Sequence, residues 1–204
     1  MRGLNQLETE IIEELVEGAL KKSAEAMEKM LKIRIKSDLL DFGAGRLRAI
    51  SGFDELGRFK VHLVKVVLKG EIGGAFYFII NAHEVDLINQ VCMPEDLVSS
   101  GKVAENKLMK HGFMSEIENM IAALSIGEIS EFLGVQLLSE VPEVMILQGD
   151  EVNDFLFDEN FSMKTAFFVK SELTGVVVNI SPFFLWMLDD TFINKLRLNI
   201  VSDP

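Results

Sequence analysis

Two polar side chains in the middle of the sequence have the types and spacing to act together as hydrogen-bonding groups on one helix face. Glu116 and Asn119 lie in the run GFMSEIENMIAALSIGEISEFLGVQLLSEVPEV, and Pro142 follows Asn119 after 22 intervening residues. On a helix, a spacing of three places two side chains next to each other. A carboxamide donates and accepts hydrogen bonds without titrating, and a carboxylate accepts charge-assisted bonds from cations. The spacing therefore places a carboxylate and a carboxamide side by side, where both could reach into the surface of another protein.

Residues 112–124 form two separate stripes when they are placed on a helix. The apolar stripe has the usual pattern of a core-facing helix and consists of Phe113, Ile117, Met120, Ile121 and Leu124. The other stripe consists of Gly112, Glu116, Asn119 and Ala123. Because Gly112 and Ala123 are small, another protein could approach the helix backbone closely along this second stripe. The alternative interpretation is an ordinary solvent-exposed helix face.

The elements that would position this pair begin with a first half of mixed helices and strands. We expect a long helix over residues 7–31, a strand over 33–42, glycine-containing turns, a hairpin of strands 59–68 and 75–80, and a short helix over 82–91. A linker over 94–101 would then lead into a second long helix over 104–133, which Gly112 could interrupt.

The second half predicts the same kinds of element in the same order. We expect strands over 135–138 and 144–147, an acidic loop over 150–159, a hairpin of 163–169 with 175–180, a short helix over 182–188 and a last strand over 196–201. The acidic loop lacks the spacing and the glycine of a calcium-binding EF-hand, so no metal site is expected there.

The order of elements and several residue matches indicate an internal repeat. A shift of 102 positions aligns Glu14 with Glu116, and a shift of 101 aligns Gly74 with Gly175 at the hairpins. Such elements cannot bury their apolar faces alone, so two copies should share one core. We therefore expect one α/β domain over residues 1–204 with pseudo-two-fold symmetry from an internal duplication. Residues 5–92 would form the degenerate first repeat and residues 104–195 the second, which carries Glu116 and Asn119.

The first repeat lacks the amide. At the shift of 102, the positions of Gly112, Glu116, Asn119 and Pro142 are occupied by Glu10, Glu14, Glu17 and Leu40. We interpret the glutamates of this helix, namely Glu8, Glu10, Glu13, Glu14 and Glu17, as a solvated acidic face.

Composition excludes several classes of partner. The formal charge of −12 and the absence of Lys/Arg clusters argue against nucleic acid and anionic membrane surfaces. Cys92 is the only cysteine, so neither an intramolecular disulfide nor a cysteine-based zinc site can form. The N-terminal segment lacks the apolar core of a signal peptide, and the longest apolar stretches are too short to span a bilayer. We expect a cytoplasmic protein with no membrane span.

The spaced residues resemble the signature of the CheC/CheX/FliY phosphatases of bacterial chemotaxis. That pattern is Asp/Ser-x3-Glu-x2-Asn-x22-Pro, and this sequence matches it at Glu116, Asn119 and Pro142. It departs from the pattern at Gly112, where Asp or Ser is expected. The resemblance implies a CheC-like pseudo-two-fold α/β domain with two long helices packed on antiparallel-rich sheets.

The resemblance also implies a reaction, namely hydrolysis of the aspartyl phosphate on a response regulator such as CheY. Asn119 would orient the attacking water and Glu116 would pair with a lysine beside the phosphate, at one active site per chain. Pro142 would be structural, shaping a strand end. Mg²⁺ and the phosphorylated aspartate would come from the receiver domain, so this chain would bind no cofactor.

Other partners and another function follow from the same resemblance. A CheD-like protein could bind the chain, and a homodimer could form by strand addition at a sheet edge, as in CheX-type proteins. The alternative function is a non-catalytic scaffold that binds a response regulator or resembles the middle domain of the flagellar switch protein FliM, which shares this fold and lacks the Glu-x-x-Asn pair.

Overall fold

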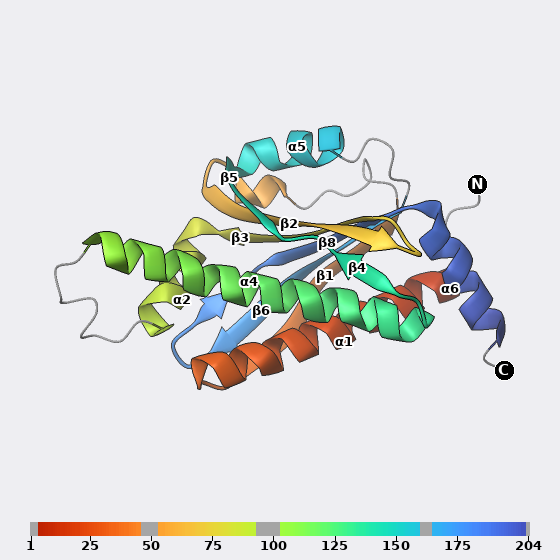
Figure 1. The fold of residues 1–204 in the computed structure, drawn as a ribbon, viewed down its shortest axis with the longest axis horizontal. Helices are drawn as coiled ribbons and strands as arrows, with labels where there is room; N and C mark the ends of the chain where they lie inside the picture. Colours follow the sequence, from red (N-terminus) through yellow and green to blue (C-terminus); the bar gives the residue numbers. More distant parts are fainter. Residues whose placement is uncertain (1–3, 46–52, 93–102, 160–164, 203–204) are drawn as a thin grey trace.

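A single antiparallel sheet forms the centre of the molecule. The computed structural model describes residues 4–45, 53–92, 103–159 and 165–202 (Figure 1). The sheet has eight strands in the order β1-β6-β8-β3-β2-β4, with β5 paired to β2 and β7 paired to β6. The strands are β1 (Ile35–Gly45), β2 (Lys60–Gly70), β3 (Gly74–Asn81), β4 (Leu137–Ser139), β5 (Glu143–Gln148), β6 (Thr165–Gly175), β7 (Asn179–Ile180) and β8 (Phe183–Leu188).

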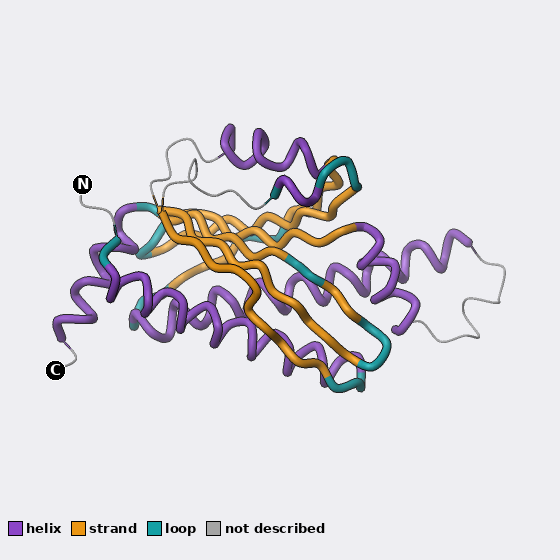
Figure 2. Tube along the Cα trace, turned by 180° about the vertical axis from the view of Figure 1, so that it is seen from behind, coloured by secondary structure: helices purple, strands orange, loops and turns teal. Residues whose placement is uncertain are grey.

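Helices cover both faces of this sheet, as seen from opposite sides in Figures 1 and 2. One face carries the long helices α1 (Gln6–Leu31) and α4 (Val103–Leu133) together with α2 (Ala82–Cys92) and α6 (Asp190–Ser202). The other face carries the short turns η2 (Asp54–Leu56) and η3 (Gly149–Glu151) and the helix α5 (Val152–Glu159). None of the described helices is long and apolar enough to cross a membrane.

Two apolar layers result from this arrangement. The larger core lies between the sheet and the two long helices, and α6 contributes Phe192 and Leu196 to it. The smaller core lies under α5, where Val152 and Leu156 pack on the opposite sheet face. The central strands β3 and β8 are buried along almost their whole length because both of their faces are covered.

The predicted long helices, the hairpin of β2 with β3, and α2 are confirmed, whereas four other predictions are wrong. Helix α4 runs without interruption through Gly112. Residues 150–159 form a turn and α5 rather than a loop, because Val152 and Leu156 anchor them to the core. Residues 182–188 contain strand β8 and no helix, and residues 196–201 belong to α6 and not to a strand. The linker expected over 94–101 lies outside the described residues.

The hairpin prediction in the second half needs a smaller correction. Strand β6 extends from Thr165 to Gly175. Of the predicted second strand, only the two residues of β7 pair with it, next to its C-terminal end. Its main partners are β1 on one side and β8 on the other. The predicted hairpin is therefore only the turn end of a longer antiparallel pair, which is formed by β6 and β8.

The two halves of the chain correspond at the expected shift in their long helices but at a different shift in their strands. The long helices end at Leu31 and Leu133, 102 positions apart, each followed by a residue with positive φ (Lys32 at 56°, Gly134 at 60°). Strands β2 and β6 have equal length but are 105 positions apart, and both contain Val-Lys-x-x-Leu-x-Gly. Gly175 therefore corresponds to Gly70 and not to Gly74. Exchanging the halves also preserves the strand order of the sheet. An origin by duplication stays a prediction.

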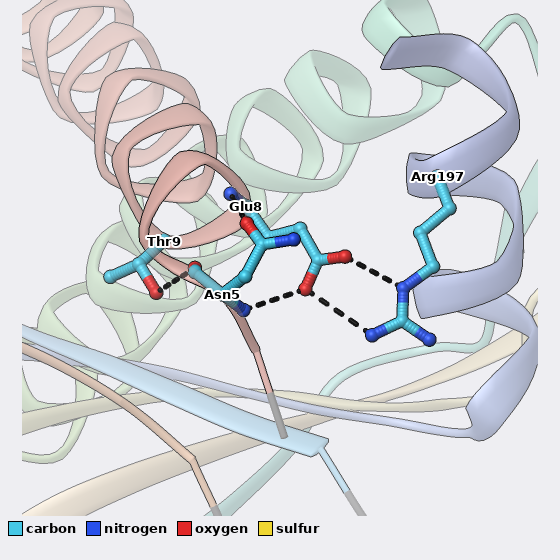
Figure 3. A network of polar contacts seen from close by, with 4 residues as sticks. All are labelled: Asn5, Glu8, Thr9 and Arg197. Atoms are coloured by element: carbon cyan, nitrogen blue, oxygen red, sulfur yellow. Dashed lines mark hydrogen bonds and ion pairs between the residues drawn. The ribbon is translucent and has the colours of Figure 1, made fainter. Parts of the chain in front are cut away.

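Glu8 joins the start of α1 to α6 (Figure 3). Its carboxylate accepts from the backbone N–H of Asn5 at 2.9 Å, and the Asn5 side chain accepts from the N–H of Glu8 at 2.9 Å, which makes a capping box. Arg197 donates from Nε to Oε1 of Glu8 at 2.6 Å and from Nη2 to Oε2 at 3.3 Å. The Arg197 hydrogen bond holds the pKa of Glu8 below its ordinary value, although burial acts in the opposite direction.

Replacing Glu8 with glutamine should lower the free energy of unfolding at pH 7 by about 1–2 kcal/mol, because glutamine keeps the capping geometry but loses the charge-assisted bonds to Arg197. Since the folded-state pKa of Glu8 is depressed, its stabilising contribution is complete above the ordinary value of 4.5 and is lost as the pH falls through the folded value. Urea unfolding of both proteins between pH 7 and pH 3 measures the difference, which should close in acid.

The matched control is Glu10→Gln, two residues further on and on the exposed side of α1, where the carboxylate accepts from the Gln6 side chain and from no other described residue. Its effect should stay within about 0.5 kcal/mol at every pH. A Glu8→Gln difference that is the same at pH 7 and pH 3 would contradict the role of the charge.

Candidate functional site

The middle of α4 presents the predicted polar stripe to solvent. Gly112, Glu116, Asn119 and Ala123 are all exposed, and Gly127 extends the same stripe by one more turn. The opposite side of the helix faces the core through fully buried side chains, among them Ile117 and Ile121. The separation of the helix into a buried face and a small-residue polar face is therefore as expected.

Glu116 and Asn119 are open to a partner. They are three residues apart on continuous helix, and neither makes a hydrogen bond or an ion pair with any residue whose side chain is described. A Cβ atom built at Gly112 would meet no atom within 4 Å, and the same holds at Gly127. Side chains of a docking protein could thus reach both polar groups without displacing part of this chain.

Pro142 belongs to a different element. It lies half-buried in the connection between β4 and β5, which both pair with β2 at one edge of the sheet. A proline has no N–H to leave unpaired, so it suits a residue between two short edge strands. The structure brings Gly112, Glu116 and Asn119 together on one helix stripe and places Pro142 on a separate element, the connection between β4 and β5.

The corresponding face of the first half is acidic and exposed. Glu10, Glu14 and Glu17 all reach solvent along α1, and Leu40 on β1 is half-exposed. The amide expected for the chemistry is absent from this face because Glu17 occupies its position. These residues agree with the interpretation of a solvated acidic face, whereas Glu8 contradicts it because its carboxylate is buried against Arg197.

Glu118 is a buried acid that the sequence analysis missed. Its side chain is 1% exposed, and its Oε1 atom has no hydrogen-bond partner in the described structure. Burial raises the pKa of the Glu118 carboxyl to about 7. Ala122, Ser125 and Ile126 are also buried, so the core-facing side of α4 is wider than the predicted stripe, which no local pattern of the sequence indicated. Glu118 lies inside that wider face.

Within the part of the chain that the structure describes, no group of three or more His, Cys, Asp or Glu side chains could hold a metal ion.

Comparison with known proteins identifies the fold. No family model and no curated sequence matches the chain. Among solved structures, FliY from Thermotoga maritima is similar, with a TM-score of 0.73, 18% identity, and coverage of 98% of this chain and 99% of that one. The FliM middle domain from H. pylori has a TM-score of 0.61, 7% identity and coverage of 95% and 99%. A chain of the FliG–FliM complex from H. pylori has a TM-score of 0.63, 6% identity and coverage of 94% and 100%.

These similarities confirm the predicted resemblance at the level of the fold. The chain is a mixed α/β domain with the architecture of the CheC/CheX/FliY proteins and of the FliM middle domain. The expected sheets form one eight-stranded sheet. Because catalytic and scaffold proteins share this architecture, the fold does not choose between the two functions.

The raised pKa of Glu118 leads to a stability prediction. A carboxyl whose pKa is about 7 when folded and near 4.5 when unfolded costs nothing in acid and destabilises the chain progressively as the pH rises through 7. Glu118→Gln removes this cost. The stability of the variant relative to the wild type should therefore increase by about 2–3 kcal/mol between pH 5 and pH 8, measured by urea unfolding.

The control is Glu116→Gln, two residues away on the exposed stripe, whose stability relative to the wild type should change by less than about 0.5 kcal/mol over the same range. Parallel pH profiles for Glu118→Gln and the wild type would show that the buried carboxyl does not titrate as argued.

Proposed function

We propose that this chain accelerates hydrolysis of the aspartyl phosphate on a CheY-like response-regulator receiver domain, with Glu116 and Asn119 as its single active site. The supporting observation is the exposed stripe on α4, where both side chains stand without described polar partners between small residues. The match to the Glu-x2-Asn-x22-Pro pattern and the similarity to the fold of FliY support the same function. The activity would be exercised in the cytoplasm.

Asn119 would direct the attacking water. The carboxamide oxygen accepts a hydrogen bond from the water while the N–H group donates to a neighbouring acceptor, which fixes the direction of the water's lone pair. The water oxygen forms a bond to phosphorus as the bond between phosphorus and the aspartate oxygen breaks. The aspartate leaves as a carboxylate with the electron pair, and both protons of the attacking water remain with the inorganic phosphate. Such phosphoryl transfer needs positioning more than covalent chemistry.

Glu116 would orient the docked receiver. Its carboxylate would form a charge-assisted hydrogen bond with a lysine beside the receiver's phosphate, one turn from the water held by Asn119. The helix carries no large side chain next to the pair on this stripe, where its residues are Gly112, Ala123 and Gly127. A loop of the receiver could therefore approach the helix backbone. The receiver would supply Mg²⁺, which neutralises charge on the transferring phosphoryl group.

A non-catalytic scaffold is the second candidate function. Gly112 departs from the family pattern, and the FliM structures that share this fold extend to a complex with FliG. In this alternative the chain would bind a receiver domain or a flagellar-switch partner without accelerating phosphate loss. A CheD-like partner and a homodimer through a sheet edge are compatible with both functions.

Asn119→Ala should reduce the chain-dependent rate of phosphate loss from a receiver domain by about a hundredfold, because the water loses its orienting group. Its circular dichroism spectrum and unfolding midpoint should match the wild type, since the side chain is exposed. The rate is measured as loss of label from a radiolabelled phosphorylated receiver.

Glu17→Ala is the matched control, because it alters the position on α1 that corresponds to Asn119 and should leave the rate unchanged. An active Asn119→Ala variant would rule out the proposed water-orienting role. A clear loss of rate in Glu17→Ala would show that the first half also takes part.

Gly112→Ser separates the two candidate functions. A serine here restores the family pattern, fits because a Cβ meets no atom within 4 Å, and suits a helix better than glycine does. The phosphatase proposal expects this variant to be at least as active as the wild type in the same assay. If neither protein accelerates phosphate loss while both bind the receiver, the scaffold function is favoured.

A further inference from the structure

A groove opens at the end of the molecule where α1, α4 and α6 meet. Its volume is about 670 Å³. The lining side chains are Leu7, Ile11, Glu14, Leu15, Glu128, Glu131, Phe132, Asn199 and Ile200. It therefore lies on the first half of α1 and the last turns of α4. Its lining residues on α4 begin at Glu128, so they follow Glu116 and Asn119 in the sequence.

Hydrogen bonds and ion pairs connect the three helices that form this groove. The Glu8–Arg197 pair fixes α6 to α1 at 2.6 Å, as Figure 3 shows. Asn199 donates from Nδ2 to the carbonyl oxygen of Phe132 at 2.5 Å, which fixes α6 to α4. Lys22 forms ion pairs with Glu128 and Glu131 and so joins α1 to α4. These contacts fix the positions of the three helices relative to one another, and with them the shape of the groove.

Large apolar side chains are exposed inside the groove. Leu7 is 52% exposed and Phe132 is 38% exposed, and they stand beside the partly buried Ile11 and Ile200. Single exposed apolar residues are ordinary, but a contiguous group lining a concavity is typical of a binding site for another apolar surface.

The lining of the groove is also acidic. It includes the exposed Glu14 and Glu131 and the largely buried Glu128, and Lys22 forms ion pairs with Glu128 and Glu131. Glu14 has no hydrogen bond or ion pair with a residue whose side chain is described. Negative charge around an apolar floor repels nucleic acid, anionic lipid and a second copy of a chain whose net charge is −12. The complementary occupant is a protein segment with apolar residues between basic ones.

Because helices form the groove, they also favour one backbone conformation of the bound segment. Helices expose no free edge of backbone N–H and C=O groups, so an extended segment lying in this groove would leave its own backbone groups unpaired. A helix satisfies its backbone internally and can lay one apolar face on the floor while its flanking residues meet the acidic side chains of the groove.

We propose that the groove between α1, α4 and α6 binds an amphipathic helix of a partner protein, with an apolar stripe flanked by lysine or arginine. Leu7 and Phe132 would contact the apolar stripe, and Glu14 and Glu131 would pair with the flanking basic residues. This binding uses neither Glu116 nor Asn119, so it is independent of the proposed phosphatase site.

The test uses a synthetic 16-residue peptide of leucine, lysine and alanine whose leucines form one helical stripe with lysines on both sides. A peptide of the same composition in scrambled order, which has no stripe, is the comparison. Fluorescence anisotropy of the labelled peptides against the full chain gives the dissociation constants. The striped peptide should bind at least about tenfold more tightly, because only it can bury its leucines and pair its lysines together.

Matched variants show whether the peptide occupies the groove. The single variants Glu14→Lys and Glu131→Lys should each weaken binding about fivefold, whereas Glu25→Lys, a charge reversal at another exposed glutamate three turns beyond Glu14 on α1, should change it less than twofold. Phe132→Ser should weaken binding, and Phe59→Ser, at an exposed phenylalanine outside the groove, should not. Leu7→Ser replaces Phe132→Ser if the latter unfolds.

Equal affinity for the striped and scrambled peptides would overturn the proposal. So would equal weakening by Glu25→Lys and the groove variants, because it would show that the acidic chain attracts any cationic peptide. Asn119→Ala should leave peptide affinity unchanged, so failure of the phosphatase proposal and failure of this one are distinguishable.

Discussion

The packing of α1 and α4 on one face of the sheet is the constraint on which the rest of the structure depends. The two helices run in opposite directions, so that the first turns of α1 lie beside the last turns of α4. Small residues on both helices, including Ser23 and Ser125, are fully buried in this layer. Because each long helix commits one face to the core, its opposite face is left for solvent or for a partner.

The two helices use their free faces differently. On α4, small residues surround one carboxylate and one carboxamide, which suits close docking of a receiver domain. On α1, the corresponding face carries glutamates, and its first half joins α6 to form the acidic groove. The same packing geometry thus supports a candidate catalytic surface in one half and a candidate binding surface in the other. Neither surface requires a residue of the other.

Much of the fold and of the candidate site could be predicted because helical period and turn residues are local signals. The exposed stripe with Glu116 and Asn119 followed from the period of α4 alone. Strand β8 could not be recognised, because its six residues are all buried and show no alternation. Helix α6 was mistaken for a strand because Leu196, Leu198 and Ile200 alternate, although the core contacts come from Phe192 and Leu196. Burial of Glu118 depends on neighbouring elements and has no local signal.

The central claim is that this chain removes phosphate from a receiver domain. The most direct measurement is the rate of phosphate loss from a chemically phosphorylated CheY-like receiver domain in Mg²⁺, with and without the wild-type chain. If the chain is a phosphatase, the rate should rise with the concentration of the chain until the receiver is saturated. A receiver that binds the chain and loses its phosphate at the unassisted rate would show that the chain is not a phosphatase for it.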